Sequence, residues 1–110
     1  MERTTVILVD DHALVRQSLR ALLEAEDDMT IVGEAENGRQ AVQISKRLEP
    51  EAILMDIVLP GLNGLEAIEQ IDLECPKSKV LILSCYSDDE YVSQMCKVGA
   101  SGYLLTPGMC

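Results

Sequence analysis

Near its N-terminus the chain reads Val6-Ile7-Leu8-Val9-Asp10-Asp11-His12, four apolar residues in succession followed by two acidic ones. Apolar residues at successive positions are typical of a strand that is covered on both faces, as in a parallel sheet between two layers of helices. Four further short apolar runs have the same character, at residues 30–32, 52–55, 80–83 and 103–105. The sequence therefore predicts five buried parallel strands.

Amphipathic segments separate these runs. In the first of them the apolar residues recur at helical spacing, and they are Val15, Leu19, Leu22 and Leu23. The polar residues of this helix fall on its other faces: Arg16, Gln17, Arg20 and Glu24. This pattern predicts a helix with one buried stripe.

Three more helices follow from start and stop signals. The second opens at Asn37-Gly38 and closes before Pro50, and the third closes before Pro76. The fourth begins with the capping-box spacing of residues 87–90 and ends before Gly99. Strands and helices thus alternate along the whole chain.

This alternation predicts an α/β fold, a flavodoxin-like doubly wound five-stranded parallel sheet with strand order 2-1-3-4-5. Such a domain normally finishes with a fifth helix, but only five residues follow Leu105. The fifth helix is therefore expected to be missing or replaced, which leaves one sheet face half uncovered. An uncovered face favours association, such as a homodimer or a swapped dimer.

Composition limits the remaining possibilities. The 110 residues suffice for one domain, spanning 1–110, and the net charge of -10 disfavours contact with DNA or an anionic membrane. No apolar run is long enough to cross a bilayer and no signal peptide is evident, so we expect a cytoplasmic protein. The four cysteines, Cys75, Cys85, Cys96 and Cys110, lack C-x-x-C spacing and are expected to be reduced thiols rather than zinc ligands.

Acidic residues follow two strands that the predicted order makes neighbours. Asp10 and Asp11 follow the first strand and Asp56 follows the third. Carboxylates crowded at the carboxyl edge of a sheet repel one another, and an oxygen-only ligand set with room for water suits Mg²⁺. The alternative is that the first two cap a helix and the third lies in a solvated loop.

The chain resembles the receiver domain of bacterial two-component response regulators over essentially its whole length. The residues that carry the resemblance are Val6-Ile7-Leu8-Val9-Asp10-Asp11-His12, the run from Leu54 to Gly64, and Gly99-Ala100-Ser101-Gly102-Tyr103-Leu104-Leu105. Details such as Val32-Gly33-Glu34-Ala35-Glu36-Asn37-Gly38 are similar to the NarL/FixJ subfamily, whose members carry a LuxR-type DNA-binding domain behind the receiver. DNA would then be bound only by an output domain outside these residues.

The resemblance implies a role for each site residue. Asp56 matches the aspartate that accepts a phosphoryl group from a sensor histidine kinase, so the domain is a phosphoacceptor rather than an enzyme. Asp10, Asp11, Asp56 and the backbone carbonyl of Val58 match the Mg²⁺ site. Ser84 and Tyr103 match the hydroxyl and the aromatic residue of the switch, which changes the surface of the fourth helix and fifth strand.

One family position differs. Thr106 stands immediately before Pro107, where the family has a lysine that contacts the phosphoryl group. An alternative function is therefore a pseudo-receiver or truncated interaction module that dimerises or binds partners without phosphorylation. A Mg²⁺-dependent phosphohydrolase is a third possibility, although Val58 stands where such enzymes have a second aspartate.

Overall fold

A computed structural model of the chain describes residues 3–56, 64–84, 97 and 99–105. The elements in this part are β1 (Thr4–Val9), α1 (Ala13–Glu24), β2 (Met29–Ala35), α2 (Gly38–Leu48), β3 (Ala52–Asp56), α3 (Gly64–Glu74), β4 (Lys79–Ser84) and β5 (Gly102–Leu105). The strands form one parallel sheet of five strands in the order β2-β1-β3-β4-β5. The predicted fold and strand order are confirmed. The predicted fourth helix and the position of the expected fifth helix lie outside the described residues.

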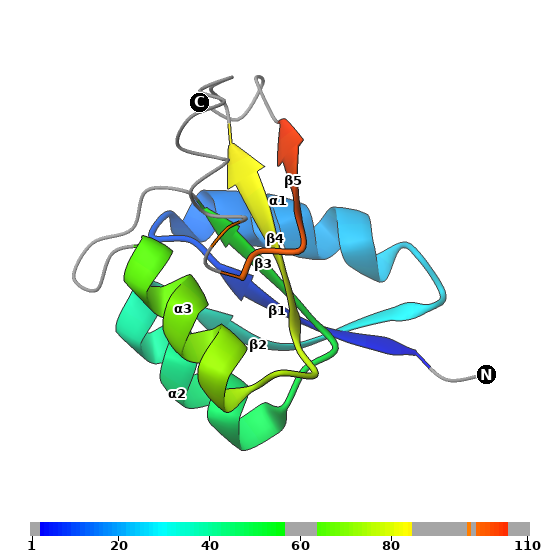
Figure 1. The fold of residues 1–110 in the computed structure, drawn as a ribbon. Coiled ribbons are helices and arrows are strands. Elements are labelled where there is room, and N and C mark those ends of the chain that lie inside the picture. The colour runs from blue at the N-terminus through cyan, green and yellow to red at the C-terminus, as the bar shows by residue number, and fades with distance from the viewer. Residues whose placement is uncertain (1–2, 57–63, 85–96, 98, 106–110) are drawn as a thin grey trace.

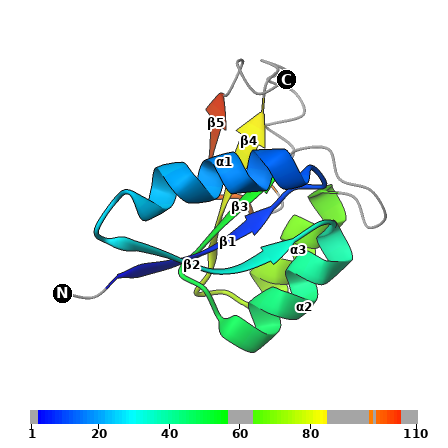
Figure 2. The ribbon, with the colours of Figure 1, turned by 180° about the vertical axis from the view of Figure 1, so that it is seen from behind.

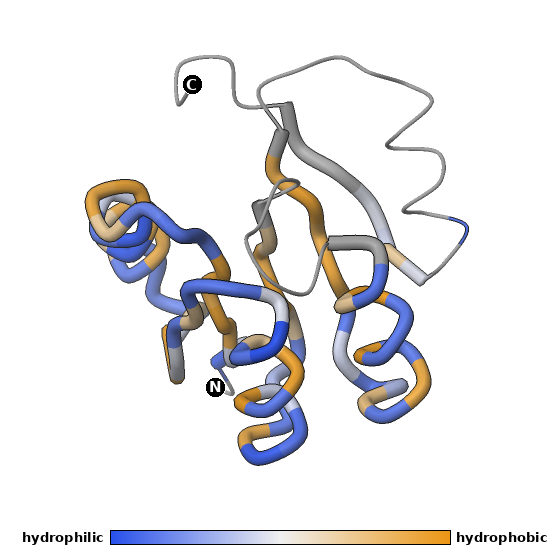
Figure 3. The backbone as a smooth tube through the Cα atoms, turned by 90° about the vertical axis from the view of Figure 1, so that its left-hand side faces the viewer, coloured by the Kyte–Doolittle hydropathy of each residue, from blue (hydrophilic) through white to orange (hydrophobic). Residues whose placement is uncertain are grey.

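Helices cover the sheet from both sides. Helix α1 lies on one face, and α2 and α3 lie together on the other (Figures 1 and 2). Successive residues of β1 serve the two sides in turn: Ile7 packs into the core beneath α2 and α3, and Leu8 packs into the core beneath α1. The strands are accordingly mostly apolar, while the helices combine polar and apolar residues (Figure 3).

The two faces are covered to different extents in the described residues. Beneath α2 and α3, Ile53 and Ile82 are 0% exposed. On the α1 side, Ala52 and Leu81 are only half-buried, and a hollow of about 330 Å³ opens beside them. Helix α1 is the one helix that the described residues place on this face (Figure 2). The residues on which the expected uncovered face depends, those after Leu105, lie outside the described part of the chain, so this expectation stays a prediction.

Strand β2 differs from its prediction. It is longer than residues 30–32, and Val32 is 37% exposed rather than buried. The reason is a shift in register: Val6 pairs with Ile31 but Ile7 pairs with Gly33, so Val32 has no partner in β1. Because β2 is an edge strand, this bulged residue faces solvent.

Helix α2 begins where the sequence predicts. The Asn37 side-chain Oδ1 accepts a hydrogen bond from the Gln40 N–H at 2.9 Å, and Gln40 Oε1 accepts one from the Glu36 N–H at the same distance. The helix ends at Leu48, and the left-handed φ of 48° at the next residue, Glu49, turns the chain just before Pro50. These contacts fix the connection between β2 and β3, the strand that ends in Asp56.

Candidate functional site

The register of the sheet places the carboxyl ends of β1, β3 and β4 side by side at the same end of the sheet. Val9 pairs with Met55, so Asp10 and Asp56 are the next residues on adjacent parallel strands. Neighbouring strands lie about 4.8 Å apart, so the two backbones are side by side. Asp56 in turn pairs with Leu83, and Ser84 comes next on β4.

The remaining predicted site residues are placed less completely. For Asp56, Ser84 and Tyr103 the structure describes the backbone, and Tyr103 pairs with Ile82 within the sheet. Val58 and Thr106 lie outside the described residues. The described side chains at the carboxyl ends of these strands are those that follow β1.

Hydrogen bonds fix both the backbone and the side chain of Asp10. Its N–H donates to the Ala35 carbonyl at 3.0 Å, which extends the β1–β2 ladder one residue beyond β1. Its Oδ1 accepts a hydrogen bond from the His12 N–H at 2.8 Å. The residue is only 5% exposed. Asp10 is thus a buried carboxylate with a fixed backbone.

Asp11 and His12 complete a compact cluster. The Nδ1 atom of His12 lies 3.1 Å from Asp10 Oδ1 and 2.9 Å from Asp11 Oδ1. One possible ligand atom from each of the three residues falls within 4.8 Å of the others, and no second such group occurs in the described ranges. The Asp11 and His12 side chains are 36% and 68% exposed, so the cluster is open to solvent on one side.

This arrangement fits a divalent cation such as Mg²⁺. Mg²⁺ takes one or two carboxylates and keeps several water ligands, and the cluster offers two carboxylates beside an open side. The Nδ1 atom of His12 lies within 3.1 Å of an oxygen of each carboxylate, so the two oxygens converge on one position. The alternative that Asp10 or Asp11 caps α1 is wrong, because the residue at the N-cap is His12.

Arg16 was missed as a site residue. The helical pattern places it among the solvent-facing residues, yet its side chain is only 12% exposed. Its Nη1 donates to the Asp10 carbonyl at 2.6 Å, and its Nε donates to Glu34 Oε1 at 2.9 Å. The available signal was the spacing of Arg16 and Arg20, one helical turn apart, together with the acidic residue Glu34 two positions after the predicted second strand.

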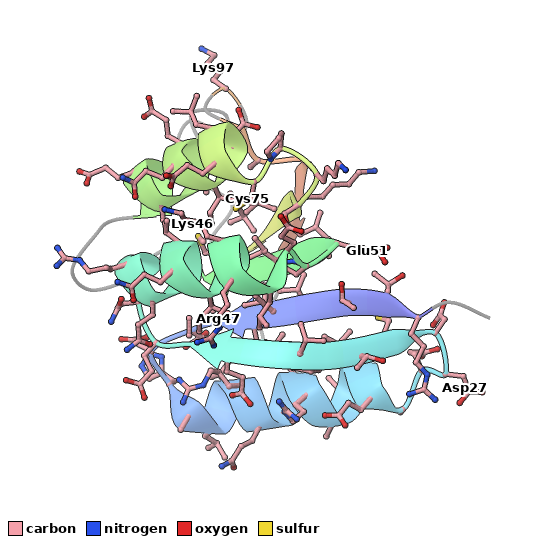
Figure 4. All side chains as sticks on the ribbon, turned by 90° about the horizontal axis from the view of Figure 1, so that it is seen from below. Asp27, Lys46, Arg47, Glu51, Cys75 and Lys97 are labelled. Atoms are coloured by element: carbon pink, nitrogen blue, oxygen red, sulfur yellow. The ribbon has the colours of Figure 1, made fainter. Side chains whose placement is uncertain are left out.

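A second polar region lies at the amino ends of the strands, where α3 leads into β4. Cys75 is buried there as a free thiol, as predicted; the other three cysteines lie outside the described residues. Burial raises the pKa of the Cys75 thiol, Glu74 and Glu49 raise it further, and Lys46 lowers it. Lys46 Nζ lies 3.3 Å from Glu74 Oε1, joining α2 to α3 (Figure 4). This thiol is protonated and is not part of the acidic cluster.

None of the helices in the described part of the chain has the length and apolar character needed to cross a membrane.

Comparison with known proteins agrees with this geometry. Residues 6–108 match the family described as the response regulator receiver domain. The transcriptional regulatory protein YdfI of Bacillus subtilis is 47% identical over 100 residues, which are 91% of this chain and 46% of YdfI. The nitrate/nitrite response regulator protein NarL of Escherichia coli is 36% identical over 104 residues, 94% of this chain and 48% of NarL. The chain thus spans about half the length of these relatives.

Solved structures show the same fold. The response regulator domain of Thermotoga maritima CheB superimposes with a TM-score of 0.90 at 30% identity, over 96% of this chain and 80% of that one. A LuxR-family two-component response regulator from Aurantimonas gives a TM-score of 0.88 at 30% identity, over 93% and 73% of the two chains. The resemblance read from the sequence is confirmed.

Proposed function

The chain belongs to the family of response regulator receiver domains, of the NarL/LuxR type, and on that basis we propose that residues 1–110 act as a phosphoacceptor domain with Asp56 as the acceptor. The sensor histidine kinase would be the donor. The observation that carries the proposal is the pairing of Val9 with Met55, which sets Asp56 beside the Asp10–Asp11 cluster.

The reaction is a phosphoryl transfer. A carboxylate oxygen of Asp56 attacks the phosphorus of a phosphohistidine, and the new P–O bond forms as the P–N bond breaks. The phosphohistidine ring already carries a proton on its other nitrogen, so it leaves as a neutral imidazole. Asp10, Asp11, Asp56 and the Val58 carbonyl would hold Mg²⁺, which when bound neutralises charge on the phosphoryl oxygens. Asp10 serves as a buried, fixed carboxylate, and the exposed side of Asp11 leaves room for the incoming group.

The signal would leave through the switch residues. The Ser84 hydroxyl would hydrogen-bond the acquired phosphoryl group, and Tyr103 would turn inward and alter the surface of β5. Ser84 directly follows Leu83, the residue of β4 that pairs with Asp56, and Tyr103 lies on β5, the strand beside β4. The output would be a DNA-binding domain in the other half of a protein as long as these relatives, regulating transcription.

The test is intact mass spectrometry after incubation with acetyl phosphate. We expect the mass of one phosphoryl group to be added when Mg²⁺ is present and not when it is chelated. Asp56→Asn should abolish the addition, whereas Asp27→Asn, an exposed residue between α1 and β2, should leave it unchanged. Phosphorylation that survives Asp56→Asn would contradict the proposal.

A second function is favoured by Thr106, which replaces the lysine of the family. In this alternative the domain dimerises without phosphorylation through the partly uncovered face beside Ala52 and Leu81. Sedimentation velocity over a wide concentration range separates the two functions. A dimer that forms without phosphate and is broken by Leu81→Glu would favour the alternative, and a monomer at all concentrations would contradict it.

A further inference from the structure

We propose that Arg16 is a positioning residue for the acidic pair: its guanidinium fixes the peptide between Asp10 and Asp11 in the orientation that cation binding needs. The proposal rests on the proposed function, because it assigns a role at the same site. Arg16 would not touch the cation or the phosphoryl group itself. It would act through the backbone that carries the two carboxylates.

The contacts of Arg16 reach three parts of the fold. Its Nη1 donates to the Asp10 carbonyl at 2.6 Å, its Nε donates to Glu34 Oε1 at 2.9 Å, and its Nη2 lies 3.7 Å from Glu36 Oε1. A guanidinium presents its donors in a rigid planar fork, so one contact fixes the direction of the others. Helix α1, the residues after β1, and β2 with the connection that follows it are thereby joined by one side chain.

The Asp10 carbonyl lies just beyond the hydrogen bonds between β1 and β2, so those bonds do not fix its orientation. The ladder between β1 and β2 ends with the hydrogen bond from the Asp10 N–H to Ala35. The next peptide, which joins Asp10 to Asp11, is the first beyond the ladder, and its carbonyl accepts from Arg16. Since the Asp11 side chain is 36% exposed, burial holds it only weakly. The orientation of this peptide therefore sets the direction of the Asp11 carboxylate.

The positive charge of Arg16 is offset by Glu34 rather than by Asp10 or Asp11. Glu34 accepts from Arg16 through Oε1 and from Arg20 through Oε2, at 2.9 and 3.0 Å. A guanidinium paired in this way supplies hydrogen bonds while Glu34 offsets its field. Arg16 can thus position Asp10 and Asp11 without neutralising the negative charge that attracts a cation.

Arg20 provides the matched control. It lies on the same helix and shares Glu34 with Arg16, but its other hydrogen bond goes to Glu24 at 3.1 Å, on the far side from Asp10. Arg16→Met and Arg20→Met each remove one guanidinium and one bond to Glu34. Of the two variants, only Arg16→Met loses the hydrogen bond to the Asp10 carbonyl; the other contacts in which they differ are to the exposed carboxylates of Glu36 and Glu24.

The experiment is a calorimetric titration of each chain with Mg²⁺ alone. Loss of a residue that orients metal ligands typically weakens metal binding about 10–100-fold, so we expect at least a tenfold weaker affinity in Arg16→Met. Arg20→Met should leave the affinity nearly unchanged, because the hydrogen bonds of Arg20 go to Glu34 and Glu24 rather than to the backbone of the acidic pair. Arg16→Lys should be intermediate, because an ammonium keeps the charge but not the fork.

A second measurement needs no metal. Hydrogen exchange of the His12 amide, which donates to Asp10 Oδ1 at 2.8 Å, should accelerate in Arg16→Met and not in Arg20→Met. If Arg16→Met proves too unstable to titrate, the same comparison is made with Arg16→Lys. Equal Mg²⁺ affinities and equal His12 exchange in the arginine variants would overturn the positioning role and leave the proposed function intact. An original chain that binds no Mg²⁺ would instead overturn the proposed function.

Discussion

Removing one charge from the acidic pair should stabilise the metal-free protein. The possible ligand atoms of Asp10 and Asp11 lie within 4.8 Å of each other. Two unit charges at that distance repel by about 0.9 kcal/mol in water and by about 3.5 kcal/mol at an effective dielectric constant of 20. Because the Asp11 side chain is 36% exposed, the lower end applies. We therefore expect Asp11→Asn to raise the free energy of unfolding by about 1 kcal/mol in the absence of Mg²⁺.

The assay is urea unfolding at low salt and mildly alkaline pH, with and without Mg²⁺. Asp27→Asn removes the same charge from an exposed position far from the cluster (Figure 4), and surface changes of this kind stay within about 0.5 kcal/mol. A cation at one hundred times its dissociation constant stabilises the fold by about 2.7 kcal/mol, and Asp11→Asn should lose most of that gain. The reasoning is refuted if Asp11→Asn is less stable than the original chain without Mg²⁺, or if Mg²⁺ stabilises both equally.

Three further predictions concern the fold. Asn37→Ala removes the cap of α2 and should lower the free energy of unfolding by about 1 kcal/mol, measured by urea unfolding beside Asn37→Asp, which retains an acceptor. Gly99→Ala should cost about 2 kcal/mol in the same assay, because Gly99 has a φ of 132° and an added Cβ would lie 2.7 Å from Asp72 Cβ; Gly102→Ala, whose nearest contact would be 3.4 Å, is the control. Because the pKa of the Cys75 thiol is raised in the folded protein, the unfolded chain loses the thiol proton at a lower pH than the folded protein does. The protonated thiol therefore contributes fully to the free energy of unfolding below the ordinary thiol pKa, and this contribution is lost as pH rises from there through the raised pKa. Stability curves against pH should accordingly fall less steeply at alkaline pH in Cys75→Ala than in the original chain.

Much of the fold could be predicted from local patterns in the sequence, because each pattern depends on neighbouring residues of one segment. Buried parallel strands must be apolar at successive positions, and the run from Val6 to Val9 shows this because both sides of β1 are covered. The end of β1 is marked by the first polar residue after the apolar run, Asp10. Strand order then sets the acidic residues after β1 beside Asp56, since parallel strands end at the same edge. The candidate site could therefore be predicted as a set of positions.

The contacts that join these positions could not be predicted in the same way. An amphipathic pattern assigns every charged residue of a helix to solvent, and Arg16 is an exception because Glu34 and the Asp10 carbonyl satisfy its donors. The exposure of Val32 depends on a register shift between β1 and β2, which is a property of the pair rather than of either sequence. Both cases involve partners distant in the chain.

The charge balance around the acidic pair bears on Thr106. The family lysine at this position would bring a positive charge to the phosphoryl group, whereas Arg16, the nearest described guanidinium to Asp10, is already paired with Glu34. Phosphorylation of this chain should therefore depend strongly on Mg²⁺. A hydrogen bond to a charged group contributes about 1.5–3 kcal/mol, so Thr106→Lys should speed phosphorylation by acetyl phosphate at least tenfold when Mg²⁺ is limiting.

The control for added charge is Thr4→Lys, the same substitution at the opposite end of β1, remote from Asp56. Initial rates of mass gain are measured for both variants across a range of Mg²⁺ concentrations. Thr106→Lys should show its advantage at low Mg²⁺ and lose part of it at saturation, because the cation and the ammonium neutralise the same phosphoryl oxygens. If the two variants gain phosphate at equal rates throughout, the phosphoryl group is not close enough to residue 106 for its charge to matter, and the departure from the family at Thr106 has no bearing on the chemistry of Asp56.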